Sequence, residues 1–144
     1  MLNKIAVLVV SLLTTASFAV DLGIPYALDC AGKSDAGVKI ELKTAGNGDD
    51  LDLVRTYKPS PTIKTKAPTQ FKIEKIGTVK GGIFEVKSVG RVMFAGGGSL
   101  TGDLSFSTES KKGVWTETIS TFDESKGIPV KHSTKYAVTC SLAQ

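Results

Sequence analysis

A single histidine, His132, is the only residue that could act as the base of a Ser-His-Asp or Cys-His mechanism. Such a mechanism also needs a nearby nucleophile and a group that orients the base. The sequence contains no Gly-x-Ser-x-Gly elbow and no His-Glu-x-x-His motif. We therefore predict that the protein is not an enzyme and that His132 is a surface residue beside a strand break or a core histidine. The alternative, a polar group inside a ligand pocket, requires an unbroken strand.

Two cysteines, Cys30 and Cys140, each follow a tyrosine by four residues, after Tyr26 and Tyr136. On an extended strand each tyrosine and its cysteine share one face. Two cysteines in a chain with a secretory leader indicate one disulfide formed in an oxidising compartment. Zinc binding by these cysteines and His132 has no support from their spacing. We predict a Cys30–Cys140 disulfide, no metal site and no cofactor.

The turn around Asn47, Asp49, Asp50 and Asp52 offers several oxygen ligands, which is what Ca²⁺ prefers. It lacks the regular acidic spacing and the distal glutamate of an EF-hand, so a solvated turn is favoured. The glycines at 96–98 precede no Lys-Ser/Thr pair and no helix, which excludes a P-loop in favour of a turn.

Residues 1–19 have the pattern of a secretory signal peptide. Lys4 supplies the positive charge, a short apolar run follows, and Ser17-Phe18-Ala19 places small residues at the cleavage positions. We expect cleavage after Ala19, with Ala16 as the alternative, which leaves 20–144 as a single all-β domain. The protein is then secreted or periplasmic. Loss of Lys4 lowers the net charge from +4 to about +3.

Positive charge is concentrated in the middle of the chain. Residues 55–91 contain nine basic side chains but only two acidic ones, Glu74 and Glu85. An anionic surface could bind there, although lysines on solvated strand faces explain the same pattern.

The proline-rich segment 58–69 reads as an exposed loop, because proline denies a sheet its hydrogen-bond donors. The candidate binding residues are Lys58, Lys64 and Lys66 of this loop, together with Trp115 and His132. For Trp115, a plug in the core is the alternative.

The body of the chain reads as β-structure throughout. Residues 38–44 alternate apolar and charged side chains, which indicates a strand with one buried face. The expected extended segments are 24–31, 38–44, 51–57, 71–80, 83–88, 91–95, 99–108, 114–122 and 128–142. We expect a bulge at Gly77, a hairpin at Gly81-Gly82, a close approach at Gly102, and a break near His132.

These segments predict a single antiparallel β-barrel or β-sandwich of about eight to nine strands, mostly up-and-down. With an even strand number, the first and last strands lie side by side, and the disulfide joins them. The function expected from this fold is non-enzymatic binding of a partner or small ligand through the loops. The alternatives are an inhibitor of a secreted enzyme and a lipocalin-like carrier of an apolar ligand. The expected partners are another secreted protein, a small apolar ligand or an anionic surface, but no nucleic acid.

Overall fold

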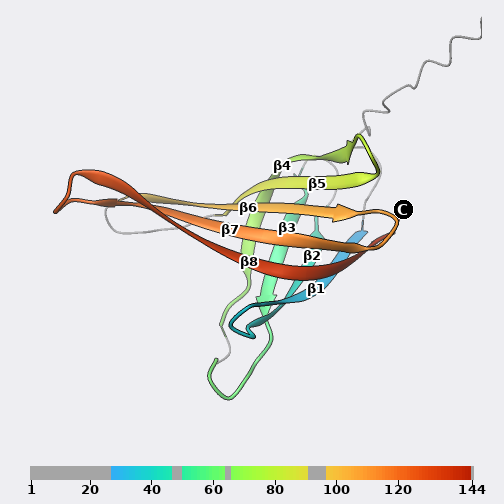
Figure 1. The fold of residues 1–144 in the computed structure, drawn as a ribbon, viewed down its shortest axis with the longest axis horizontal. Helices are drawn as coiled ribbons and strands as arrows, with labels where there is room; N and C mark the ends of the chain where they lie inside the picture. Colours follow the sequence, from blue (N-terminus) through green and yellow to red (C-terminus); the bar gives the residue numbers. More distant parts are fainter. Residues whose placement is uncertain (1–26, 47–49, 64–65, 91–96, 144) are drawn as a thin grey trace, which may run out of the picture.

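A computed structural model describes residues 27–46, 50–63, 66–90 and 97–143, which form a closed barrel of eight antiparallel strands (Figure 1). Each strand pairs with the next along the chain, and the last pairs with the first. The strands are β1 (Ala27–Ser34), β2 (Lys39–Ala45), β3 (Asp52–Tyr57), β4 (Thr69–Val79), β5 (Ile83–Gly90), β6 (Gly98–Ser107), β7 (Lys112–Asp123) and β8 (Ile128–Ala143). The predicted up-and-down antiparallel fold is confirmed, and of the two predicted alternatives, barrel and sandwich, the structure has the barrel.

The barrel closes because apolar side chains alternate along the strands and point inward. In β2, Ile40 and Leu42 are buried while Lys39 and Lys43 are exposed. The same alternation in the other strands fills the interior with one continuous apolar cluster. Its buried members are Leu28, Cys30, Ile40, Leu42, Leu53, Phe71, Phe84, Val86, Leu100, Leu104, Phe106, Trp115, Tyr136, Val138 and Cys140. Burial of this surface, at about 25 cal/mol per Å², is the main force that closes the barrel.

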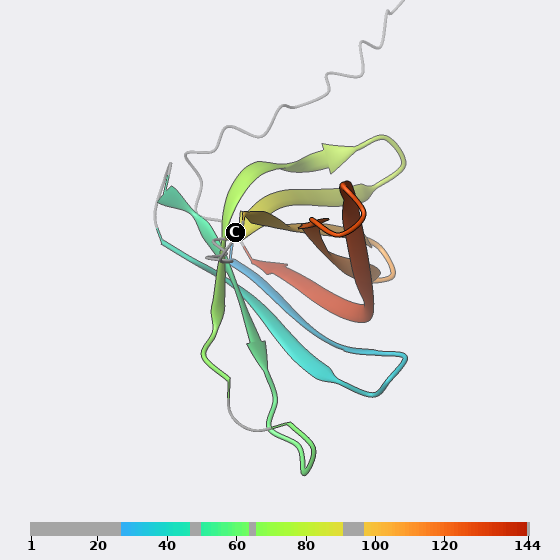
Figure 2. The same ribbon diagram turned by 90° about the vertical axis from the view of Figure 1, so that its left-hand side faces the viewer.

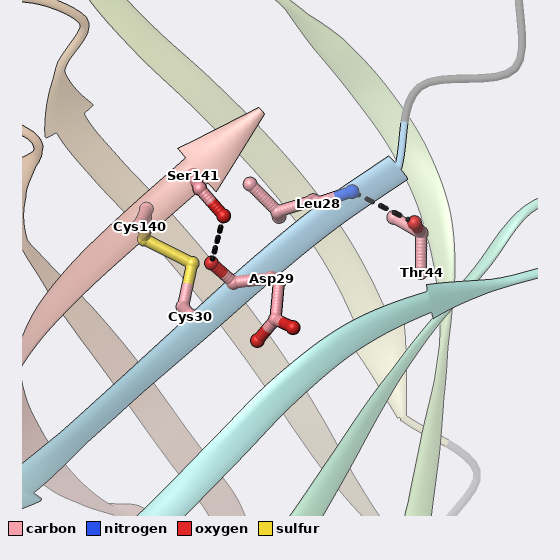
Figure 3. The surroundings of a disulfide bond; sticks show 6 residues. All are labelled: Leu28, Asp29, Cys30, Thr44, Cys140 and Ser141. Atoms are coloured by element: carbon pink, nitrogen blue, oxygen red, sulfur yellow. Dashed lines mark hydrogen bonds between the residues drawn. A yellow bond between two sulfur atoms is a disulfide. The ribbon is translucent and has the colours of Figure 1, made fainter. Parts of the chain in front are cut away.

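The seam between β1 and β8 carries the predicted disulfide. Cys30 and Cys140 occupy directly opposite positions in an eight-residue antiparallel ladder, and their sulfur atoms are bonded (Figure 3). Beside them, the Ser141 hydroxyl donates to the carbonyl of Asp29 across the seam. The predicted closure of the fold by its first and last strands is therefore confirmed.

Trp115 is the largest side chain of the interior, and Gly102 on β6 makes room for it. A Cβ atom at Gly102 would overlap the Trp115 indole. The Trp115 ring also packs edge-on against Phe71, with 5.1 Å between ring centroids. The close approach expected at Gly102 is confirmed, and the centre of the barrel is filled by aromatic rings.

Of four local expectations, two were wrong, one is confirmed, and one lies outside the described residues. The register shift in β4 lies between Ile73 and Lys75, so Gly77 is not the bulge. β8 runs unbroken from Ile128 to Ala143, and the break expected near His132 does not occur. The hairpin at Gly81-Gly82 is present, with both glycines at positive φ. The expected short strand 91–95 lies within residues 91–96, which are outside the described residues.

β8 can continue without a break because its first half leaves the barrel. β7 and β8 form a long hairpin that extends beyond β1, at the left of the view in Figure 1, and β6 runs beside it as far as Thr121. β1 reaches β8 only from Tyr136 onward. Within the described part of the chain, no helix is long and apolar enough to cross a membrane.

Removing the seam disulfide should weaken the fold without changing the strand order. The bond closes a loop with a sequence separation of 110, for which chain entropy gives about 4–5 kcal/mol as an upper figure. We expect the double variant Cys30→Ala/Cys140→Ala to unfold at lower urea concentration while its far-ultraviolet circular dichroism stays that of a β-protein. A variant as stable as the oxidised wild type would contradict this role.

Candidate functional site at the barrel mouth

A hollow of about 270 Å³ lies at the end of the barrel where β1 and β3 end. We call it the mouth. Its lining comes from the β1–β2 connection, the end of β3, the segment that follows β3, and the middle of β8. The described lining residues are Ser34, Ala36, Val38, Tyr57, Ile63, Lys66, Thr134 and Tyr136. The mouth therefore combines apolar walls, several hydroxyl groups and one cation.

The β1–β2 connection forms one wall of the mouth through a tight turn. The backbone N–H of Val38 donates to the side-chain hydroxyl of Ser34 at 3.2 Å, and the backbone N–H of Ser34 donates to the carbonyl of Val38 at 2.9 Å. The N–H of Gly37 donates to the Ser34 carbonyl at 2.9 Å, and Gly37 has a φ of 80°, which favours glycine. This turn holds Ala36 and Val38 at the rim.

The segment after β3 forms the opposite rim and projects from the end of the barrel (Figure 2). Ser60 and Ile63 exchange two backbone hydrogen bonds, and the Ile63 N–H lies 3.1 Å from the Ser60 hydroxyl oxygen. Lys58 is held at its base by an ion pair with Glu41 at 2.7 Å. Within the predicted loop, residues 58–63 thus form a small closed turn that the Lys58–Glu41 ion pair anchors at its start.

A buried ion pair lies inside the barrel next to Tyr57 of the mouth. Arg55 on β3 donates two hydrogen bonds to Glu117 on β7, at 2.6 and 2.8 Å. The Trp115 indole N–H donates to the same carboxylate at 2.8 Å. Arg55 and Glu117 are only 5% and 6% exposed. Because β3 and β7 stand four strands apart in an eight-stranded barrel, this pair bridges opposite walls.

Tyr57 connects this ion pair to the open end. Its ring lies 4.0 Å from the Arg55 guanidinium carbon and 5.6 Å from the Lys66 ammonium nitrogen. Both distances fit cation–π attraction. Within the described residues, Lys66 makes no ion pair, so its charge is not neutralised by a protein carboxylate.

Tyr136 is a hydrogen-bond donor at the mouth that resists ionisation. Burial, followed by a hydrogen bond with Tyr57, raises the pKa of the Tyr136 phenol well above its ordinary value. The phenol therefore stays neutral at physiological pH. Because the hydrogen bond with Tyr57 stabilises the protonated phenol, the Tyr136 hydroxyl donates to Tyr57, and its oxygen remains able to accept a hydrogen bond from a ligand.

The structure places the sequence-predicted binding residues in different parts of the molecule. Lys66 lines the mouth, Lys58 is paired at the base of the loop, and Lys64 lies outside the described residues. Trp115 is fully buried, so it is the core plug and not a surface recognition residue. His132 is exposed on the projecting part of β8, even though the strand is unbroken.

Two residues of the site, Tyr57 and Tyr136, were not singled out from the sequence as binding residues, and the partner of Arg55 was missed. Arg55 interrupts the apolar face of its strand, and Glu117 falls two residues after the buried Trp115. Opposite charges on two inward faces are a signal of a buried pair. The sequence does not reveal it, because nothing local shows that these two strands face each other across the interior.

The chain has no significant match to a protein-family model, a curated protein or a solved structure. The geometry of the molecule is therefore the basis for assigning a function.

The other basic and acidic features do not form a comparable site. Of the basic residues in 55–91 that the structure describes, Arg55 is internal, Lys66 is at the mouth, and Lys72 and Lys87 are exposed on other strands. A second depression of about 340 Å³ is lined by Asp50, Asp52, Gln70, Lys72 and Val89. Among the described residues, no three His, Cys, Asp or Glu side chains are grouped to hold a metal ion.

The buried ion pair predicts a strong dependence of stability on both partners. Glu117→Gln keeps an acceptor for Trp115 but leaves the Arg55 charge unpaired, which should cost about 3–5 kcal/mol of unfolding free energy. Adding Arg55→Met removes that charge and should recover most of the loss. Urea unfolding of the two single variants and the double variant measures their coupling. A loss below about 1 kcal/mol for Glu117→Gln would contradict the buried pair.

The raised pKa of Tyr136 predicts a loss of stability in alkaline solution. The folded protein holds this phenolic proton more tightly than the unfolded chain, in which the pKa is about 10. The stabilising contribution is complete below a pH of about 10 and is lost as the pH rises toward the folded pKa. We expect the unfolding free energy of the wild type and of Tyr57→Phe to fall more steeply above that pH than that of Tyr136→Phe. Equal slopes would contradict this prediction.

Proposed function

We propose that the protein is a secreted or periplasmic binding protein that takes a small anionic ligand with an apolar part at the barrel mouth. The observation that carries this proposal is the cation of Lys66 beside Tyr57, in a hollow whose described lining contains no acidic residue. Val38 and Ile63 supply apolar walls to the same hollow. A carboxylate on a small hydrocarbon or aromatic group matches both features.

The location rests on two independent features. The signal-peptide pattern of residues 1–19 directs export, and the Cys30–Cys140 disulfide is compatible with an oxidising compartment. The proposal of export does not depend on the ligand.

Binding fits the mouth better than catalysis. The groups that line it are a lysine, hydroxyl groups and a phenol whose pKa is raised, so they can attract and orient an anion. The exposed His132 belongs to the projecting hairpin and is not among the lining residues.

The packed interior favours a ligand at the mouth over an apolar ligand deep inside the barrel. Trp115, Phe71 and Phe84 are at most 1% exposed, and together they occupy the centre that a carrier would need to leave open. The volume of the mouth also limits the ligand to a small molecule, because drug-sized ligands fill pockets of roughly 300–1,000 Å³.

A second candidate function is inhibition of a secreted enzyme through the loop at 58–63. The observation that favours it is the closed turn between Ser60 and Ile63, which projects from a disulfide-linked barrel (Figure 2). A preorganised loop loses little entropy on binding a partner. This function would use the outer side of the loop, whereas the first would use Ile63 from within the mouth.

Ligand binding at the mouth can be tested with benzoate and its neutral analogue benzamide. We expect benzoate to shift the amide resonances of residues 34–38, 57, 63 and 134–136 in a two-dimensional NMR titration. Lys66→Gln should weaken benzoate binding about fivefold, which corresponds to about 1 kcal/mol for one partly solvated ion pair. Lys87→Gln is the matched control, since it removes one exposed lysine from β5, away from the mouth.

Two results would contradict the proposal. One is equal binding of benzoate and benzamide, which would show that the charge of Lys66 is not used. The other is an equal effect of Lys66→Gln and Lys87→Gln, which would show that benzoate responds only to net charge.

A further inference from the structure

The first half of β8 is a strand with one side unpaired. Residues Ile128–Lys135 pair with β7, whereas β1 joins β8 only at Tyr136. Among the described residues, none pairs with the other side of this half-strand. We call Ile128–Lys135 the free edge. Every residue of it from Lys131 to Lys135 is exposed.

The register identifies which backbone groups face outward along the free edge. The Cys140 N–H donates toward the β7 side, to the carbonyl of Lys111. Hydrogen bonding alternates sides along a strand, and β8 has no register shift against β7 or β1. Even-numbered residues therefore bond toward β7. The N–H and C=O groups of Lys131, Ser133 and Lys135 point away from it.

These outward groups are in the geometry that an added strand requires. An extended segment that aligns with a sheet edge gains a ladder of main-chain hydrogen bonds, and its alternate side chains meet those of the edge strand. One face of the free edge carries Ile128, which is 50% exposed, and Val130, and Ile119 of β7 lies on the same face opposite His132 and is 37% exposed. Apolar side chains of an added segment would cover this surface.

The charge of the free edge selects the partner. Lys131, His132 and Lys135 lie within it, and it contains no acidic residue. The two acidic side chains on the paired half of β7 already have partners, because Glu117 binds Arg55 and Asp123 binds Lys126. Cross-strand pairs of opposite charge stabilise a ladder, so an acidic segment complements this edge.

A second copy of this chain fits the free edge poorly. Antiparallel pairing that uses all three outward-facing residues must be centred on Ser133. That register places Lys131 of one copy opposite Lys135 of the other, and directly opposed like charges destabilise a ladder. Pro129 further lacks a donor, and lysine and proline are the residues by which exposed edges avoid self-association.

We infer that the free edge of β8 binds an extended acidic segment of another protein by antiparallel strand addition. This partner site adjoins the mouth, with which it shares Thr134, but it does not depend on the small ligand proposed there. The segment would carry acidic side chains on the face that meets Lys131 and Lys135, and apolar side chains on the face that meets Ile128 and Val130.

The test uses a blocked nine-residue peptide in which glutamate alternates with valine, titrated into the full mature protein by isothermal calorimetry and NMR. Two control peptides separate charge from hydrogen bonding. One replaces every glutamate with lysine, and the other carries N-methyl groups on alternate backbone nitrogens. We expect the acidic peptide to bind and to shift the amides of Lys131, Ser133 and Lys135, and both controls to bind at least about tenfold more weakly.

Matched protein variants locate the site. Ser133→Pro removes an outward-facing donor from an edge that tolerates proline, and it should abolish binding of the acidic peptide. Lys131→Glu/Lys135→Glu should weaken binding about tenfold, whereas Lys72→Glu/Lys87→Glu makes the same charge change elsewhere and should have little effect. Lys66→Gln should leave peptide binding unchanged, which separates this result from the mouth.

The inference is overturned if the acidic peptide does not bind at millimolar concentration to a folded protein, or if the N-methylated peptide binds equally well. It is also overturned if both double charge reversals have the same effect. Concentration-dependent dimerisation that Ser133→Pro abolishes would assign the edge to a second copy instead.

Discussion

The pairing of β1 with β8 is the constraint on which the rest of the molecule depends. A meander of eight strands leaves two edges unless its ends meet, and here the ends meet over eight residue pairs with Cys30 bonded to Cys140 at their centre. Closure converts the alternating pattern of each strand into a shared interior. The end of β1 at Ser34 also sets the end of the barrel interior, where the mouth opens. The part of β8 before Tyr136 therefore has no β1 partner.

Inside the closed wall, one charged pair connects the packed centre to the open end. Arg55 and Glu117 reach across the barrel from opposite strands, and Trp115 and Tyr57 contact them from the core side and the mouth side. A buried pair of this kind gains little net stability over apolar residues, because desolvation offsets its attraction. Its structural consequence is positional. Because the Arg55 guanidinium packs on the Tyr57 ring, the ion pair holds this ring in place near the Lys66 ammonium group. The two recognition features that we propose, a small polar hollow and a strand edge, therefore adjoin each other at Thr134.

Much of the fold follows from the sequence because its determinants are local. The alternation in β2, the glycine turns and the two cysteines predict strands, hairpins and closure without knowledge of distant contacts. The errors have a common cause, which is that barrel geometry is not local. The length of β8 suggested a break at His132, but the strand continues outside the barrel, where no curvature forces it to bend or end. In the same way, Arg55 looks like an interruption until the barrel brings Glu117 opposite to it. The mouth was missed because its residues come from three distant segments.

Residue-resolved hydrogen exchange of the mature protein tests the central claim most directly, because closure and the free edge make opposite predictions for one strand. Ala137 and Thr139 of β8 face β1, so their amides should exchange with the slow rates of global unfolding. Lys131 and Ser133 face away from β7 in the same strand, so their amides should exchange at rates close to those of an unpaired chain. Slow exchange at all four amides would contradict the free edge, and fast exchange at all four would contradict the closed barrel.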